Sequence, residues 1–260
     1  MIAAPSRVTA RRSAVRPLMV FAAVAVLGGG SLLALSRLVR PGEPFLLAAV
    51  YGTLLLPALV LARAERGPGA VRELLGQAIR LPRPLWWLLV AGAAVPLATW
   101  APGAALGLAR PVTWTTLAAF VLDVVIGLVV INLAEELAWT GYFQSRAMTR
   151  WGVAGGSLVT AAFFTAIHVP LAVDPARDVM SSMMNIATLA GVAVGFRLLV
   201  GRLYDWTGGS VAAVGLLHAA FNASEELLLA GHDWVRLAAT LGIAIAAVTA
   251  GSRRTRQART

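Results

Sequence analysis

Cysteine and lysine are both absent from this 260-residue chain, and charged residues make up only 13% of it. Without cysteine, the chain has no disulfide framework, no disulfide-linked partner, no thiolate metal ligand and no cysteine nucleophile. Any catalytic chemistry must therefore use Glu, Asp, His, Asn, Ser or Thr. The low charge content, against about one quarter in soluble domains, excludes an ordinary soluble protein.

Apolar sequence is abundant instead, with 58% hydrophobic residues and a mean hydropathy of +0.77. The apolar residues come in blocks near about 20 residues, each long enough to cross a hydrocarbon layer of about 30 Å as a helix. We therefore predict an all-α polytopic integral membrane helix bundle with about eight transmembrane helices. The predicted spans are 17–39, 44–62, 84–108, 113–143, 152–172, 179–200, 208–230 and 233–250.

All 22 basic side chains are arginines, and they give the chain a net charge of +10. They lie at the ends of apolar blocks rather than along an amphipathic face, which argues against a nucleic-acid partner. With eight spans, 17 arginines, Arg197 among them, fall on the side of both termini and 5, including Arg177, on the other. The positive-inside rule then predicts that both termini are cytoplasmic, in a multi-pass protein of a bacterial plasma membrane.

Three parts of the chain are distinguished by these patterns. Residues 1–110 hold the first three predicted helices and an interfacial amphipathic helix near residues 70–80, with Leu74, Leu75 and Ile79 on its apolar side. Residues 111–230 form a core, and residues 231–260 a last helix with a basic cytoplasmic tail. The first span has the basic start of a secretory signal, but its apolar run exceeds the usual 7–15 residues, which favours an uncleaved helix.

Ionisable side chains inside the predicted spans are the first candidates for function, because a charge in hydrocarbon costs at least a few kcal/mol. An antiparallel hairpin turning near residues 150–152 would place Glu135 and His168 at the same depth, each about 24 Å from the turn. A carboxylate and an imidazole could therefore meet. Glu135 and its neighbour Glu136 lie about 100° apart around a helix, so one should act and the other should support it.

A second polar pair occurs in the predicted span 208–230. His218 and Asn222 are four residues apart and face the same way on a helix, at a depth close to that of the first pair. Four polar residues on three helices could thus converge. Asp123, Asn132 and Asn185 are interpreted as interhelical hydrogen-bonding residues, although Asn132 is near Glu135 on the helix surface and could instead support that carboxylate.

These residues form three motifs in order, EE at 135–136, FTAIH at 164–168 and HAAFN at 218–222. In this the chain resembles the CPBP family of intramembrane proteases, the CAAX-prenyl-endopeptidase-like or bacterial Abi group, with motifs EExxxR, FxxxH and HxxxN or HxxxD. The resemblance covers roughly residues 113–230. One position departs from it, because the arginine of the first motif would fall at Thr140, so its (i, i+4) pair with Glu136 is missing.

The resemblance implies an endopeptidase that hydrolyses a peptide bond of a membrane-associated protein or peptide, in or beside the cytoplasmic half of the bilayer. In it, Glu135 paired with His168 activates a water molecule, His218 and Asn222 form the oxyanion site, and Glu136 is the orienting partner. A prenylated CAAX protein is the substrate that the family name suggests. The implied partners are the lipid bilayer and this substrate.

The sequence leaves the role of a metal open. Glu135, His168 and His218 could supply the mixed nitrogen and oxygen ligands of a catalytic zinc with water in the fourth position. The usual HExxH spacing is absent, so a metal-free glutamate-histidine mechanism is slightly favoured.

Two other functions compete with the protease. Thr140 keeps open a catalytically weak or inactive relative that binds a membrane partner, for example in bacteriocin immunity. A small proton-coupled transporter would predict repeat symmetry, but only a weak likeness between WGVAGGS and WTGGS is present.

Overall fold

The computed structural model describes residues 7–173 and 178–257, which leaves Arg177 and residues 258–260 of the basic tail outside the described residues. Within these ranges the chain is helical, and the only β-bridge is an isolated one between Ala109 and Leu228. The helices, with π-helical and 3₁₀ segments marked η, are α1 (Arg7–Ala23), η1 (Val24–Gly29), α2 (Gly30–Leu38), α3 (Glu43–Leu47), η2 (Ala48–Leu55), α4 (Leu56–Arg66), α5 (Pro68–Gly76), α6 (Trp86–Ala105), α7 (Trp114–Gly127), η3 (Leu128–Asn132), α8 (Leu133–Glu136), η4 (Leu137–Gln144), α9 (Ser145–Ala172), α10 (Val179–Trp206), α11 (Val211–Ala223), η5 (Ser224–Leu227) and α12 (Trp234–Gln257).

Six continuous helical stretches in the described ranges are long and apolar enough to cross a membrane, which confirms the predicted all-α membrane bundle. They are Val15–Leu38, Glu43–Arg66, Trp86–Ala105, Trp114–Ala172, Val179–Trp206 and Trp234–Gly251. The fourth turns back at Gly152, whose φ of 72° is a conformation that glycine adopts without steric cost. The predicted hairpin near residues 150–152 is therefore confirmed, and this stretch makes two passes.

The predicted span 208–230 is shorter than expected. Its helix α11 has 13 residues, about 20 Å at 1.5 Å per residue, and so falls short of a hydrocarbon layer of about 30 Å. It begins after a turn in which Gly208 and Gly209 both have positive φ, and the Ser210 side chain caps its first turn by accepting from the Ala213 N–H. By itself this helix is therefore too short to cross the hydrocarbon layer.

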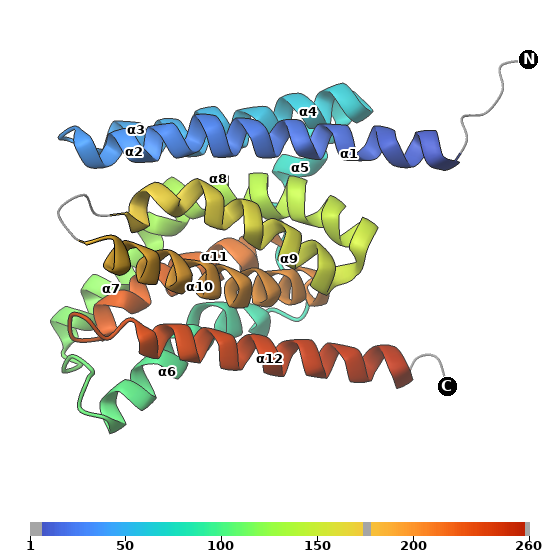
Figure 1. The fold of residues 1–260 in the computed structure, drawn as a ribbon. Coiled ribbons are helices and arrows are strands. Elements are labelled where there is room, and N and C mark those ends of the chain that lie inside the picture. Colours follow the sequence, from blue (N-terminus) through green and yellow to red (C-terminus); the bar gives the residue numbers. More distant parts are fainter. Residues whose placement is uncertain (1–6, 174–177, 258–260) are drawn as a thin grey trace, which may run out of the picture.

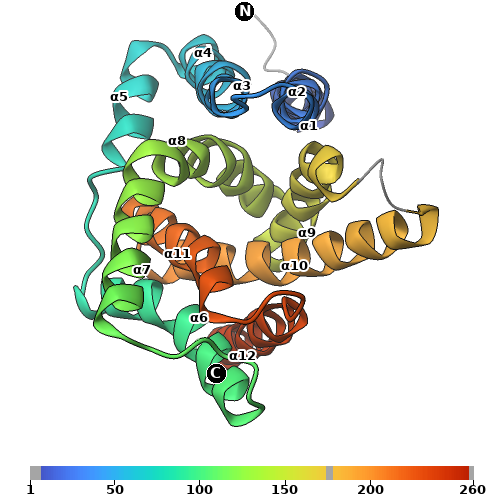
Figure 2. The ribbon, with the colours of Figure 1, turned by 90° about the vertical axis from the view of Figure 1, so that its left-hand side faces the viewer.

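Helix α11 lies in the middle of the molecule, with longer helices on several sides (Figure 2). It packs against α6, α7, α8 and α10, while the hairpin α1–α4 covers the outer side of α9 and η4. On the opposite side, α6 and α12 pack together (Figures 1 and 2). The N-terminal helices grouped as residues 1–110 therefore lie on two faces of the molecule. The beginning of α1 and the end of α12 lie at the same end of the bundle, as eight passes predict (Figure 1).

The predicted amphipathic segment near residues 70–80 contains the short helix α5, but its apolar side is narrower than expected. Leu74 is buried, whereas Leu75 and Ile79 are 42% and 81% exposed. A Cβ on Gly141 would lie 2.8 Å from Leu74 Cδ1, so α5 packs tightly against η4 at that point. The segment thus supports the helix that carries the first motif.

The buried apolar side chains form two clusters. One includes Phe21, Trp139 and Phe164, and joins the N-terminal hairpin to η4 and α9. The other includes Phe196 and Phe221, and joins α6, α10, α11 and α12. The polar residues of the three motifs lie where these two clusters meet.

Candidate active site

The first motif lies on a helix with an irregular hydrogen-bond pattern. The single α-helical turn α8, which carries both glutamates, stands between the π-helical segments η3 and η4. Such segments are rare and are often found at functional sites. Both carboxylates point away from the surface, since Glu135 is 6% exposed and Glu136 is fully buried.

Glu136 accepts hydrogen bonds from three side chains. The guanidinium of Arg197 donates to both of its oxygens, Nη1 to Oε2 and Nη2 to Oε1, each at 3.0 Å. The Thr140 hydroxyl donates to Oε2, and His218 Nδ1 lies 2.7 Å from Oε1. Because Glu136 is the acceptor in every one of these contacts, the arrangement holds it as a carboxylate.

Arg197 is the functional residue that the sequence interpretation missed. The prediction that it belongs to the cytoplasmic arginines is wrong, because its side chain is fully buried inside the bundle. Its guanidinium carbon lies 4.0 Å from the centre of the Phe164 ring. An arginine in the middle of an apolar span is itself a signal of function, and the stretch GVAVGFRLLVG contained that signal.

The two motif histidines lie on either side of Phe164. The ring centroid of Phe164 is 4.3 Å from that of His168 and 6.1 Å from that of His218. His168 Nδ1 lies 2.7 Å from the Phe164 carbonyl oxygen, which can only accept, so this nitrogen carries a proton. Nε2 of the neutral His168 ring then has a free lone pair, and neither Nε2 has a hydrogen-bond partner among the described residues.

The orientation of His218 follows from Glu136 in the same way. Nδ1 donates to the carboxylate, so Nε2 carries a proton only when the ring is an imidazolium. In that form Nε2 can donate to a developing oxyanion, with Glu136 balancing the charge. The pair His218–Glu136 therefore suits charge stabilisation, and His168 suits proton acceptance.

Glu135 makes no hydrogen bond to another described residue, which distinguishes it from its neighbour Glu136. Its carboxylate is close enough to His168 to act electrostatically on the imidazole. The two groups predicted to meet therefore lie within electrostatic range of each other, with no direct hydrogen bond between them. An unpaired buried carboxylate beside a histidine lone pair can accept a proton from water.

Asn222 opens onto a polar recess of about 330 Å³. Asn132 also lines this recess; its side chain is buried and its Nδ2 has no hydrogen-bond partner among the described residues. Sequence analysis assigned Asn132 to interhelical hydrogen bonding, but the described residues offer its Nδ2 no such partner. The recess therefore has polar side chains on its wall, Asn222 among them, while the Nδ2 atom of Asn132 is covered by neighbouring atoms.

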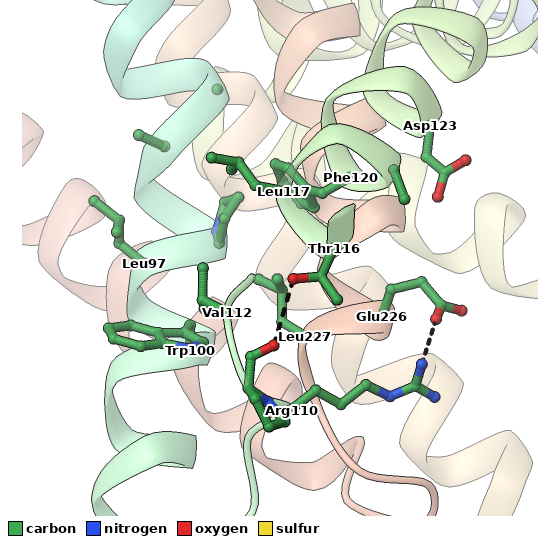
Figure 3. A pocket seen from close by; sticks show the side chains of 15 residues that line it. Leu97, Trp100, Arg110, Val112, Thr116, Leu117, Phe120, Asp123, Glu226 and Leu227 are labelled. Atoms are coloured by element: carbon green, nitrogen blue, oxygen red, sulfur yellow. Dashed lines mark hydrogen bonds and ion pairs between the residues drawn. The ribbon is translucent and has the colours of Figure 1, made fainter. Parts of the chain in front are cut away.

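An apolar groove adjoins the recess, and the two share Asp123 and Glu226 on their walls. The groove has a volume of about 550 Å³ and runs between α6 and α7, with Leu97, Trp100 and Phe120 on its walls (Figure 3). Arg110 bridges to Glu226 at 3.0 Å on its rim (Figure 3). A polar site next to an apolar groove can hold a polar bond of a ligand whose neighbouring part is apolar.

Within the described part of the chain, no group of three or more His, Asp or Glu side chains is placed to hold a metal ion. Glu135, His168 and His218 therefore do not meet as the ligands of a zinc site would. Both imidazoles have a protein partner at Nδ1 and no partner at Nε2 among the described residues, which is also how metal-ligating histidines are held, so the part of zinc is left to experiment. Each ring is thus oriented by a group of the protein itself.

The arrangement agrees with a comparison of the chain against models of protein families. Residues 116–224 match the model described as type II CAAX prenyl endopeptidase Rce1-like. No curated protein matches the chain. The matched range contains both glutamates, both motif histidines, Asn222 and Arg197. Over residues 116–224, the chain is therefore similar to the Rce1-like family of type II CAAX prenyl endopeptidases.

Proposed function

We propose that this protein is an intramembrane endopeptidase that hydrolyses a peptide bond of a membrane-associated protein or peptide with a water molecule activated by Glu135 and His168. The observation that carries the proposal is the division of labour between the two adjacent glutamates. Glu136 is fully engaged by Arg197 and His218, whereas Glu135 is buried, unpaired and beside His168. The family match supports the reaction class.

The chemistry assigns a task to each group. The water oxygen attacks the carbonyl carbon while its proton passes to Glu135, and the free Nε2 of His168 orients the water. The negative charge that develops on the carbonyl oxygen is stabilised by Nε2–H of His218 and by the Asn222 amide. The carbon–nitrogen bond then breaks as Glu135 returns the proton to the leaving amine.

The neighbouring surface supports a substrate with an apolar portion. The recess beside Asn222 would receive polar main-chain groups next to the scissile bond, and the apolar groove would receive the adjoining apolar side chains or a prenyl group. The walls of the apolar groove are formed by the membrane-spanning helices α6 and α7. We therefore expect the substrate to enter the groove from the lipid bilayer. We propose that the class of substrate is a membrane-associated protein or peptide, including the CAAX type.

The competing interpretation of an inactive relative depended on Thr140, and no comparison favours it. Glu136 has its guanidinium partner in spite of Thr140. The reason for expecting a weakened site is therefore removed.

The proposal is tested with purified, reconstituted protein and fluorogenic peptides with and without a prenyl group. Cleavage should fall by at least about 100-fold in Glu135→Gln and in His168→Ala, the order of a lost proton-transfer group. Glu73→Gln is the matched control, since this carboxylate is exposed, pairs with Arg66 and lies on α5 away from the recess and the groove. A parallel series with a metal chelator decides whether zinc takes part. A folded wild type that cuts none of the peptides would contradict the proposal.

A further inference from the structure

The first motif of this chain lacks its arginine, yet its second glutamate is bound by a guanidinium. The motif places the arginine at position 140, one helical turn after Glu136, and Thr140 stands there. Arg197, 61 residues from Glu136 in sequence and on α10, binds the carboxylate instead. The Thr140 hydroxyl contacts the same carboxylate, and Arg197 Nη1 lies 3.4 Å from Thr140 Oγ1. Thr140 and Arg197 therefore share the place of one arginine.

We propose that Arg197 is a positioning residue that replaces the missing motif arginine from another helix. Its guanidinium fixes Glu136, and through Glu136 it fixes the ring of His218 with Nε2 toward the substrate. The proposal rests on the proposed protease function and adds a residue to it. Arg197 itself touches no substrate and acts through Glu136.

The contacts of Glu136 show how a single guanidinium on α10 can orient the His218 ring. Both oxygens of the carboxylate are occupied by the two Nη atoms at 3.0 Å, a bidentate geometry that fixes the carboxylate plane. His218 Nδ1 meets Oε1, one of these fixed oxygens, at 2.7 Å. With the carboxylate plane fixed, the imidazole has one direction in which to satisfy Nδ1.

Arg197 is in turn held firmly by its surroundings. Gln144 Nε2 donates to the Arg197 carbonyl oxygen at 2.9 Å and contacts Ser157 Oγ at 3.0 Å, so the backbone of α10 is tied to η4 and α9. The face of the guanidinium lies over the Phe164 ring, which also packs on His168. One cation thus contacts the supports of both motif histidines.

The experiment moves the guanidinium from one helix to the other. Arg197→Met should lower kcat/KM by at least about 100-fold, the order expected when a catalytic histidine loses its orientation. The double variant Thr140→Arg/Arg197→Met restores the EExxxR motif and fills the vacated volume, and should recover activity to within about tenfold of wild type. Thr140→Gln/Arg197→Met, which fills the same space without charge, should stay inactive. Arg202→Met, on the same helix, should keep wild-type activity.

A second readout does not depend on proteolysis. The chain has three histidines, so selective ¹⁵N-histidine labelling gives a spectrum in which the His218 ring nitrogens can be assigned with His218→Gln. Arg197→Met should shift the His218 Nδ1 resonance, and Thr140→Arg/Arg197→Met should return it toward the wild-type value. If the wild type does not cut peptides, the protease proposal fails, while this spectrum still tests Arg197.

The outcomes separate the two proposals. Recovery of both activity and the His218 resonance in Thr140→Arg/Arg197→Met, but not in Thr140→Gln/Arg197→Met, supports the positioning role even where Arg197→Met alone fails to fold. Equal recovery in both double variants would show that volume and not charge is required. An unchanged His218 resonance in folded Arg197→Met would equally overturn the proposal.

Discussion

Two adjacent carboxylates in this protein are held in opposite ways. Glu136 is part of a buried network with Arg197, Thr140 and His218, whereas Glu135 has no ion pair among the described residues. Removing one member of a buried ion pair leaves the other charge uncompensated, which costs about 3–5 kcal/mol. Removing an unpaired buried carboxylate leaves no such charge behind.

The variants Glu136→Gln and Glu135→Gln should therefore differ in their free energy of unfolding. Glu136→Gln should lower the free energy of unfolding by about 3–5 kcal/mol, because Arg197 stays buried without its anion. Glu135→Gln should unfold at the wild-type temperature or above it while losing activity. Thermal unfolding of both variants in detergent, with activity measured beside it, checks this pair. If Glu135→Gln unfolds as early as Glu136→Gln, the Glu135 carboxylate is a structural group.

The buried amide of Asn132 leads to a second prediction at this scale. Its Nδ2 is buried without a partner among the described residues, and the residue lines the recess that holds Asn222, so we expect a substrate carbonyl in the recess to displace the atoms that cover this amide and pair with it. Asn132→Leu should lower kcat/KM by about 10- to 100-fold, the range of one donor lost from an oxyanion site or slightly less. Its stability should be kept or raised, because a buried polar group without a partner is removed.

The control for Asn132 is Asn185→Leu, in which an exposed amide that donates to the Ala172 carbonyl is removed. Activity should be retained in that variant. Loss of stability together with activity in Asn132→Leu would instead indicate an interhelical role, as sequence analysis had assigned to Asn132.

At the residue scale, sequence could identify the two motif pairs because each is local to one helix or one hairpin. Glu135 and His168 were placed at one depth by counting residues from a turn. The partner of Glu136 could not be found in that way, because Arg197 reaches it from a helix that begins after the hairpin. A count of charges by side of the membrane placed Arg197 at a surface, although an arginine deep in an apolar span signals burial.

Among the elements, α9 and α10 are brought together at one glycine. A Cβ on Gly201 would lie 2.3 Å from Ser157 Oγ and 2.8 Å from Gln144 Nε2, closer than any real contact. Gln144 Nε2 donates to the carbonyl oxygen of Arg197. The close packing of α10 at Gly201 therefore also sets the position of Arg197.

Gly201→Ala should therefore move α10 away from α9, with a loss of about 1–3 kcal/mol in stability and a lower activity at the displaced Arg197. Gly191→Ala is the matched control on the same helix, because its Cβ would meet Leu237 Cδ1 at an ordinary 3.6 Å. That control should keep or gain stability, since alanine is the better helix former. Thermal unfolding and peptide cleavage of the two variants provide the comparison. Equal behaviour would contradict the role of close packing at Gly201.

The long apolar elements could be predicted from sequence because length and hydropathy alone define them. The shortness of α11 could not, since the apolar residues 227–230 after it continue the hydropathy pattern although the chain has left the helix. The π-helical segments around Glu135 and Glu136 have no signature in the residues themselves. The π-helical segments rotate the side chains of η4 relative to their directions in a regular helix of 3.6 residues per turn. A prediction that assumes a regular helix therefore misplaces them.

For the whole molecule, the orientation in the membrane decides where the groove opens. The groove and recess lie by residues 106–113 and 224–233, at the end of the bundle opposite the start of α1 and the end of α12. If the termini are cytoplasmic, as the arginine distribution predicts, the groove opens toward the other leaflet. In that case the substrate would enter from the outer leaflet, whereas the sequence predicts cleavage in or beside the cytoplasmic half of the bilayer.

The absence of cysteine makes this orientation measurable without background. Thr149→Cys lies in the exposed turn of the hairpin, and Ala230→Cys lies in the exposed connection before α12, at the other end of the bundle. Without the buried Arg197, the division of arginines predicted from the sequence is 16 to 5, so the positive-inside rule still predicts that the end with the termini is cytoplasmic. A membrane-impermeant maleimide should therefore label Ala230→Cys in intact cells, and Thr149→Cys only after permeabilisation. The reverse pattern would place the termini outside and open the groove toward the cytoplasm.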